Sequence, residues 1–203
     1  MNILALCCAF NNSFLGISYD DKNISRIIKS DENYHSLYLI SKIKDYIKKE
    51  NINLDKLDAI CVNTGPGSFT GIRVAMTLAK VIAGELNLPI IPLNTSEILL
   101  NAFDCEILLM DARRDMYFIG TKENIELVYK NKIEEKISNK KLLTDERSKE
   151  MFENSICYET ENKNLGEIML ELAKNKYQKE TDKSKFNFIN AEANYIQTPP
   201  IFN

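Results

Sequence analysis

Two periods of hydrophobic and polar positions alternate along the first hundred residues. Short apolar runs bounded by turn residues predict strands, and longer runs with a period of three to four predict helices. The predicted strands are 3–10, 14–19, 24–28, 57–62 and 89–92, and the predicted helices are 34–49, 72–86 and 95–102. The order β-β-β-α-β-α-β-α is that of an RNase H-like domain, so an α/β fold is expected.

The second half of the sequence is less regular. Its predicted strands are 106–110, 116–120, 126–129 and 156–158, and its predicted helices are 146–153 and 165–176. The polar segment 130–149 as a whole gives no assignment. We expect a first subdomain at 1–102, a smaller, degenerate second one at 103–185, and a tail at 186–203 that returns to the first. The charged stretch 174–185 is interpreted as a boundary or a surface link.

Composition and charge indicate a globular protein and argue against a nucleic-acid-binding protein that acts alone. Of the 203 residues, 44% are hydrophobic and 27% charged, which is typical of a globular protein with a real core. The net charge of -3 gives no electrostatic footprint for nucleic acid on its own. Any RNA substrate would therefore be held mainly by something else.

The number and positions of the cysteines and the single histidine argue against a disulfide frame and a metal site. The five cysteines are an odd number and lie mainly in apolar contexts, so reduced, buried thiols in a cytoplasmic protein are expected rather than a disulfide frame. With one histidine, His35, and no CxxC pair, we expect no metal site of the usual His/Cys type. No segment is long enough to predict a membrane span.

A glycine-rich turn joins the strand 57–62 to the helix 72–86. Its residues, which we take as a structural motif, are Gly65, Pro66, Gly67, Ser68, Phe69, Thr70, Gly71 and Arg73. The layout of strand, glycine turn and helix is that of a phosphate loop. However, Gly71 is followed by Ile72 and Arg73 instead of Lys and Ser/Thr, and the sixth position of a dinucleotide motif is Thr70 instead of glycine. We therefore expect a tight turn, in which Ser68 or Thr70 caps the helix.

The helix after this turn carries small residues at every fourth position. Gly71, Ala75, Ala79 and Ala83 lie in one row, and only a narrow polar stripe remains elsewhere on the helix. This pattern predicts a helix buried on two sides, with its own sheet on one and a protein partner on the other. The predicted partner-binding residues are Leu39, Ile43, Tyr46, Gly71, Ala75, Ala79, Ile82 and Ala83. The alternative is that the two helices 34–49 and 72–86 simply pack on each other over one core.

Three motifs of the sequence resemble those of a known family. The run Gly65-Pro66-Gly67-Ser68-Phe69-Thr70-Gly71-Ile72-Arg73 looks like the signature of the bacterial TsaB (YeaZ) family. The run Asp111-Ala112-Arg113-Arg114, followed by Tyr117, resembles the family's second signature. His35-Ser36 matches the start of its His-Ser-Glu motif. These landmarks stand in the family's order.

The resemblance implies an actin-like/Hsp70-like ATPase fold made of two subdomains, each with a mixed sheet flanked by helices. It implies a non-catalytic scaffold or activator subunit, required for threonylcarbamoylation of the adenosine next to the anticodon in tRNA. The implied partner is a TsaD-type transferase, contacted by the helices of the first domain. This chain would interact with a TsaE-type ATPase and with tRNA only as part of the complex. No cofactor is expected on this chain alone, whereas ATP and a divalent metal are expected in the partner subunits.

Three departures from the family pattern limit what is implied. The first strand ends in Cys7-Cys8-Ala9 where the family has Asp-Thr-Ser, so whether any nucleotide binds stays open. The other two are Leu37 in place of the motif's Glu, and Tyr195-Ile196-Gln197 in place of Tyr-Leu-Arg. The roles of Asp111 and Arg113 stay open between a turn-stabilising pair and a contact to the partner or tRNA, as does self-association without a partner.

Two enzymatic alternatives have less support in the sequence. A stand-alone ATPase of the actin-like fold would need a carboxylate on the first strand and a second phosphate loop. A glycoprotease-like hydrolase would need a histidine pair or equivalent ligands. A Ser-His-Asp set of Ser68, His35 and Asp111 is conceivable in any chain of this length, and no spacing supports it.

Overall fold

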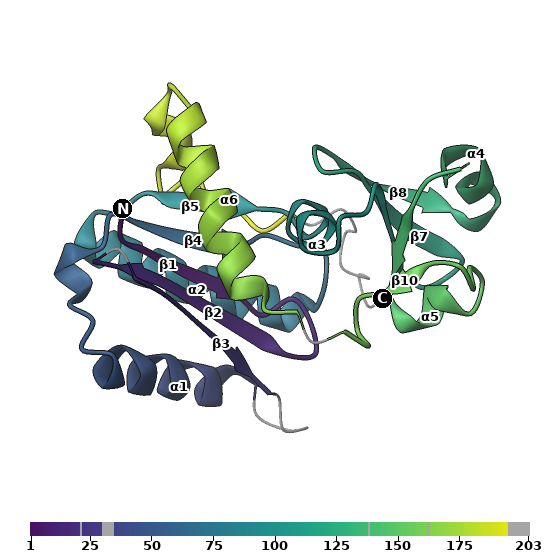
Figure 1. Ribbon diagram of the computed structural model, residues 1–203. Helices are drawn as coiled ribbons and strands as arrows, with labels where there is room; N and C mark the ends of the chain where they lie inside the picture. Colours follow the sequence, from purple (N-terminus) through teal and green to yellow (C-terminus); the bar gives the residue numbers. More distant parts are fainter. Residues whose placement is uncertain (21, 30–34, 138, 162, 195–203) are drawn as a thin grey trace, which may run out of the picture. The chain divides into compact units, whose positions relative to one another are not determined.

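The chain folds into two units, each built on a five-stranded sheet (Figure 1). This computed structural model describes residues 1–20, 22–29, 35–137, 139–161 and 163–194, with residues 35–39 described in backbone only. The first unit consists of Met1–Thr95 and Asn164–Asn194, and the second contains Ser96–Lys163.

The sheet of the first unit has the order β3-β2-β1-β4-β5. Its strands are β1 (Ile3–Cys7), β2 (Ser13–Tyr19), β3 (Lys22–Ile28), β4 (Ala59–Asn63) and β5 (Ile90–Leu93). Strands β1, β2 and β3 form an antiparallel meander, whereas β4 and β5 run parallel to β1. The helices of this unit are α1 (His35–Lys49), α2 (Phe69–Leu86) and α6 (Leu165–Lys179), with short 3-10 turns η1 (Leu54–Lys56) and η3 (Lys183–Phe186).

Helices cover both faces of this sheet. On one face, α1 and α2 enclose an apolar core with alternate strand residues such as Leu4, Leu6 and Ile60. On the other face lies α6, which Figure 1 shows across the front of the sheet. The approach of α6 is close, because a Cβ added to Gly16 would lie 2.4 Å from the carbonyl oxygen of Gly166.

The second unit repeats the strand order of the first as β10-β9-β6-β7-β8. Its strands are β6 (Ile107–Asp111), β7 (Met116–Gly120), β8 (Ile125–Tyr129), β9 (Leu142–Thr144) and β10 (Ile156–Cys157). Again the first three are antiparallel and the last two run parallel to the first. Its other elements are α3 (Thr95–Phe103), whose first residue still belongs to the first unit, η2 (Lys130–Lys132), α4 (Ile133–Ile137) and α5 (Glu146–Lys149). The two units are both RNase H-like and share the same topology. This arrangement confirms the predicted actin-like fold.

Two boundaries differ from those expected from the sequence. Helix α6 was assigned to the second subdomain, yet it packs on the first sheet, and α3 clusters with the second unit after Thr95. The charged stretch 174–185 is not a link, because it forms the end of α6 and the turn η3. The segment 186–194 lies on the first unit, where Ala191 is buried and the amide of Asn194 donates to the carbonyl oxygen of Thr64 at 2.8 Å.

Candidate functional site: the glycine turn and the helices beside it

The glycine turn is held by a buried polar network. Asn63, the last residue of β4, accepts a hydrogen bond of 2.6 Å from the amide of Gly65 through its side-chain oxygen. Thr95 donates its hydroxyl to the carbonyl oxygen of Pro66 at 2.5 Å, and its amide donates to that of Gly65 at 2.9 Å. Asn63 and Thr95 are both fully buried. The peptide bond between Gly65 and Pro66 is cis. The turn is thus anchored from β4 and from the start of α3.

The glycines of this turn permit close packing on the end of β1. A Cβ on Gly67 would lie 2.5 Å from the carbonyl oxygen of Ala9, and one on Gly71 would lie 1.8 Å from that of Cys8. Real Cβ atoms do not approach a backbone oxygen so closely, so no larger side chain fits at either position without a backbone shift. Gly65 has a φ of 100°, a conformation that glycine adopts at little cost.

Three amides of the turn, those of Gly65, Ser68 and Gly71, are bonded within the chain. A phosphate loop binds its ligand through free backbone N–H groups at the start of a helix. Here the amide of Ser68 donates to the carbonyl oxygen of Ala9 at 2.8 Å, and that of Gly71 to the hydroxyl of Ser68 at 3.2 Å. Ser68 is therefore the N-cap of α2, as one of the two caps expected from the sequence. The amide of Gly65 is likewise bonded to Asn63, so these three amides are not free to bind a phosphate.

The cysteines at the end of β1 are buried, protonated thiols. Burial raises the pKa of Cys7 to about 11, against weaker opposite effects of hydrogen bonds from Ala9 and Asn63. Burial, with a smaller contribution from Cys7, raises the pKa of Cys8 to about 12. Because the thiolate is the form that binds metals and attacks electrophiles, neither residue supplies at neutral pH the charge of a carboxylate. This strand end does not fit a metal–nucleotide complex.

The row of small residues on α2 faces the chain's own sheet. Ala75, Ala79 and Ala83 are each 0% exposed, and Gly71 lies against β1. The prediction that this row meets a partner is therefore corrected, since the close backbone approach it permits is used within the first unit. The periodicity indicated a close neighbour but could not identify it.

The remaining predicted contact residues are divided between core and surface. Ile43 is buried in the core of the first unit, and Tyr46 and Ile82 are half-buried against it. The side chains of Leu39 and His35 lie outside the described residues, as do those of the whole His35-Ser36-Leu37 motif and of Tyr195-Ile196-Gln197.

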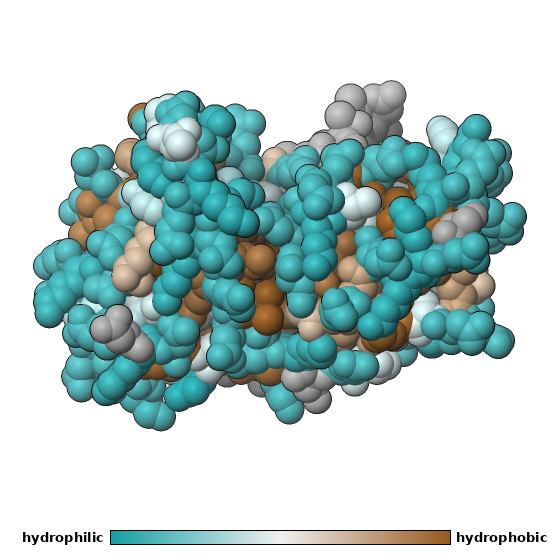
Figure 2. Space-filling model, turned by 45° about the horizontal axis from the view of Figure 1, so that its top comes forward, coloured by the Kyte–Doolittle hydropathy of each residue, from teal (hydrophilic) through white to brown (hydrophobic). Residues whose placement is uncertain are grey.

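Three apolar residues that the sequence reasoning did not include among the contacts are exposed on the same two helices. They are Ile40 on α1 and Phe69 and Val81 on α2, with exposed fractions of 46%, 39% and 64%. The guanidinium of Arg73 lies over the ring of Phe69, 3.8 Å from its centroid. These three residues lie on the outer sides of helices whose inner sides are buried. Apolar residues outside the buried side of each helix were the feature of the sequence that could have identified them. By contrast, the face on the side of α6 is mostly hydrophilic (Figure 2).

The second motif stabilises a tight turn between β6 and β7. The carboxylate of Asp111 accepts the amide of Arg113 at 2.8 Å and pairs with the guanidinium of Arg147 at 3.1 Å. Of the two roles left open by the sequence, a turn-stabilising contact forms, but through the backbone amide of Arg113, and Arg147 supplies the cation. Arg113, Arg114 and Asp115 all have positive φ, which is rare for residues other than glycine.

A neighbouring carboxylate, Asp145, joins β6 to α5. It accepts the amide of Asp111 and the amide of Ser148, both at 2.7 Å, and it is 9% exposed. This residue was not predicted from the sequence, although an aspartate directly before the predicted helix 146–153 is a typical N-cap.

The described residues contain neither a metal-binding cluster nor a membrane-spanning helix. Within the ranges given above, no cluster of three His, Cys, Asp or Glu residues has a geometry for a metal ion. In the same part of the chain, no helix is both long and apolar enough to cross a membrane.

Comparison with known proteins places the chain in a family. A family model described as "TsaD: tRNA N6-adenosine threonylcarbamoyltransferase" matches residues 24–197. The tRNA threonylcarbamoyladenosine biosynthesis protein TsaB of Bacillus subtilis is 32% identical over 143 residues, which are 68% of this chain and 59% of that protein. The protein of the same name from Buchnera aphidicola subsp. Baizongia pistaciae is 41% identical over 70 residues, 34% of this chain and 32% of the relative. The match therefore spans less than two thirds of either relative.

Solved structures agree with the fold. An uncharacterised protein similar to peptidase YeaZ, from Pseudomonas aeruginosa, superposes with a TM-score of 0.77 at 16% identity, covering 97% of this chain and 99% of that one. YeaZ from Pseudomonas aeruginosa gives a TM-score of 0.64 at 17% identity, covering 87% and 92%. With the GPGSFTG turn and the Asp111 turn in place, the chain belongs to the TsaD family described by the matching model and, within it, to the TsaB (YeaZ) group.

Proposed function

We propose that this chain is a non-catalytic subunit in the biosynthesis of threonylcarbamoyladenosine in tRNA, and that it docks a TsaD-type transferase through α1 and α2. The names of its relatives support the pathway, since they are called tRNA threonylcarbamoyladenosine biosynthesis proteins. The class of the partner is the one that the family resemblance implies, and the matching family model carries the description of such a transferase.

The observation that carries the non-catalytic assignment is the closure of the glycine turn. Its amides at Gly65, Ser68 and Gly71 are bonded inside the chain, and the strand beside it ends in protonated thiols. A nucleotide would have to displace these bonds without a carboxylate to hold its metal. We therefore assign ATP and a divalent metal to the partner subunits, including a TsaE-type ATPase, and tRNA binding to the complex as a whole. The site of action is the cytoplasm.

The proposed docking surface consists of Ile40, Phe69 and Val81. Each has a large exposed apolar side chain on a helix whose inner face is already buried. Burial of such side chains in a partner is favourable by about 25 cal/mol per Å² of apolar surface. Phe69 is also stacked with Arg73, and aromatic and arginine side chains are enriched among residues that dominate interfaces.

Calorimetry with a purified TsaD-type subunit tests the docking surface. Val81→Glu should leave the protein folded, because the side chain is 64% exposed, and should weaken binding more than tenfold by placing an unpaired carboxylate in the interface. Tyr129→Glu is the matched control, since Tyr129 is 66% exposed but lies in the second unit. Unchanged affinity of Val81→Glu, or equal losses in both variants, contradicts this docking surface.

Reconstitution tests the non-catalytic role. Incubated alone with tRNA and threonylcarbamoyl-adenylate, the chain should form no modified adenosine, and addition of the TsaD-type subunit should give activity that depends on both proteins. Modification by the chain alone, or a partner that is equally active without it, would refute the proposal.

A further inference from the structure

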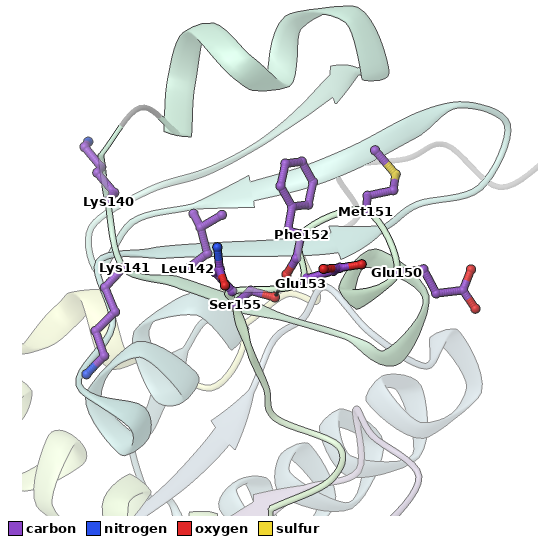
Figure 3. Close-up of a pocket in the computed structure, with 9 residues that line it drawn as sticks. Lys140, Lys141, Leu142, Glu150, Met151, Phe152, Glu153 and Ser155 are labelled. Atoms are coloured by element: carbon purple, nitrogen blue, oxygen red, sulfur yellow. Dashed lines mark hydrogen bonds between the residues drawn. The ribbon is translucent and has the colours of Figure 1, made fainter.

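A cavity of about 500 Å³ lies in the second unit, apart from the glycine turn and the proposed docking helices (Figure 3). It is bounded by the segment that leads into β9 and by the loop between α5 and β10. Its lining residues are Lys140, Lys141, Leu142, Glu150, Met151, Phe152, Glu153, Asn154 and Ser155. The volume is within the range of sites for small molecules.

The floor of the cavity is continuous with the core of the second unit. Leu142 and Phe152 are half-buried and pack against the cluster that contains Leu109 and Ile133. Met151 is 38% exposed, and its sulfur lies 3.1 Å from the hydroxyl of Tyr117. Figure 3 shows the side chains of Leu142, Phe152 and Met151 projecting to the same side. An apolar ligand would extend a core that this unit leaves partly open.

The loop that forms one wall is held by its own hydrogen bonds. The ammonium of Lys149 donates to the carbonyl oxygens of Glu153 and Ser155. The hydroxyl of Ser155 lies 2.6 Å from the carbonyl oxygen of Phe152, to which it donates, and 2.8 Å from the hydroxyl of Thr144. A wall that is already ordered loses little conformational entropy when a ligand binds.

Opposite charges stand at the two ends of the apolar row. Figure 3 shows Lys140 at one end, on the same side as Leu142, and Glu150 at the other end, with a second carboxylate, Glu153, between them. Lys141 points in the opposite direction from Lys140. Lys140 and Glu150 are exposed, and neither forms an ion pair with another residue that the structure describes. Both are therefore available to a ligand.

We propose that this cavity binds a short peptide with free ends, its carboxylate beside Lys140, its ammonium beside Glu150, and its apolar side chains along the wall between them. A nucleotide carries negative charge alone and would be repelled at Glu150 and Glu153, and a sugar lacks both charges. A peptide of a few residues has the two charges and the apolar body in the required order. This proposal is independent of the docking surface on α1 and α2.

A titration of the ¹⁵N-labelled full chain with the free tripeptide Leu-Ala-Leu tests this site. The amide signals of Leu142, Met151 and Phe152 should shift and saturate at millimolar peptide. The same tripeptide with an acetylated amino end and an amidated carboxyl end should bind more than tenfold more weakly, because it lacks both charges.

Adjacent lysines provide a matched pair of variants. Lys140→Ala should weaken binding roughly fivefold, the upper range for an exposed ion pair, and Glu150→Gln should do the same. Lys141→Ala makes the same change of charge and should alter affinity less than twofold. The absence of shifts at 10 mM peptide (roughly the limit of a useful small-ligand titration), equal binding of the capped tripeptide, or equal losses in Lys140→Ala and Lys141→Ala would each overturn the proposal. Because all three side chains are exposed, the remaining spectrum reports whether each variant is folded.

Discussion

Thr95 and Pro66 are 29 positions apart in the sequence, yet the hydroxyl of Thr95 donates a buried hydrogen bond of 2.5 Å to the carbonyl oxygen of Pro66. Together with the bond from the amide of Thr95 to Gly65, this contact fixes the glycine turn from a residue outside its motif. The shape of the turn is thus determined by β4 and α3 as much as by its own glycines.

Thr95→Val should destabilise the protein by about 1–3 kcal/mol. Valine has a similar shape but no hydroxyl, so the carbonyl oxygen of Pro66 loses its buried donor. Urea unfolding followed by circular dichroism measures the change. Thr77→Val, at an exposed position of α2, should change stability by less than about 0.5 kcal/mol. Equal effects of the two substitutions would contradict the role given to Thr95.

Two glycines of α2 should respond to alanine in opposite directions. Gly71→Ala places a methyl group 1.8 Å from the carbonyl oxygen of Cys8, so a loss of about 1–3 kcal/mol or more is expected. Gly84→Ala meets only the ring of Phe188, at 3.5 Å, and should stabilise the helix by about 0.5–1 kcal/mol. Thermal unfolding of both variants checks this prediction, and a stable Gly71→Ala would show that the turn can move away from β1.

The buried thiols predict a loss of stability at alkaline pH. In the unfolded chain Cys7 and Cys8 ionise near their ordinary pKa of 9.0, whereas in the folded protein they stay protonated up to about 11 and 12. Between these values unfolding releases protons, so stability falls as pH rises, by about 1.4 kcal/mol per pH unit for each thiol. Below pH 9 the two thiols contribute no pH dependence.

Urea unfolding at pH 7.5 and pH 10 measures this slope. The double variant Cys7→Ala with Cys8→Ala should show a smaller decrease between the two pH values, while the lysines and tyrosines common to both proteins contribute equally. An unchanged decrease in the double variant would show that the thiols are not the cause.

Of the two partners of Asp111, the buried carboxylate of Asp145 should contribute more to stability than the exposed guanidinium of Arg147. Asp145→Ala leaves the amides of Asp111 and Ser148 without their acceptor and should cost about 1–3 kcal/mol. Arg147→Ala removes an ion pair whose arginine is 67% exposed and should cost less than about 1 kcal/mol. Denaturant unfolding of both variants decides the order, and a larger loss for Arg147→Ala would contradict it.

The sequence predicted most elements of the fold because their hydrophobic periods are local. Strand 116–120 was predicted with the bounds that the structure shows, and the glycine turn stands where strand and helix signals met. The segment 130–149 gave no assignment because α4 and β9 contain only five and three residues, too few to show a period.

What the sequence could not predict is which surface an amphipathic element covers. The pattern of α6 shows one apolar side but does not say which of two sheets it meets, and the row at Ala75 and Ala79 shows a close neighbour without its identity. The N-cap role of Asp145 is local and could have been predicted, but its bond to the amide of Asp111, 34 positions away, could not. Such assignments depend on contacts between residues far apart in the chain.

The position of α6 has a consequence for how the protein is made on the ribosome. The sheet face that contains Gly16 is complete in the nascent chain long before α6, which covers it, has been synthesised. The whole of the second unit leaves the ribosome between the two. Folding of the first unit therefore cannot finish in step with its translation, and a nascent chain that ends before Leu165 presents a bare sheet face to chaperones.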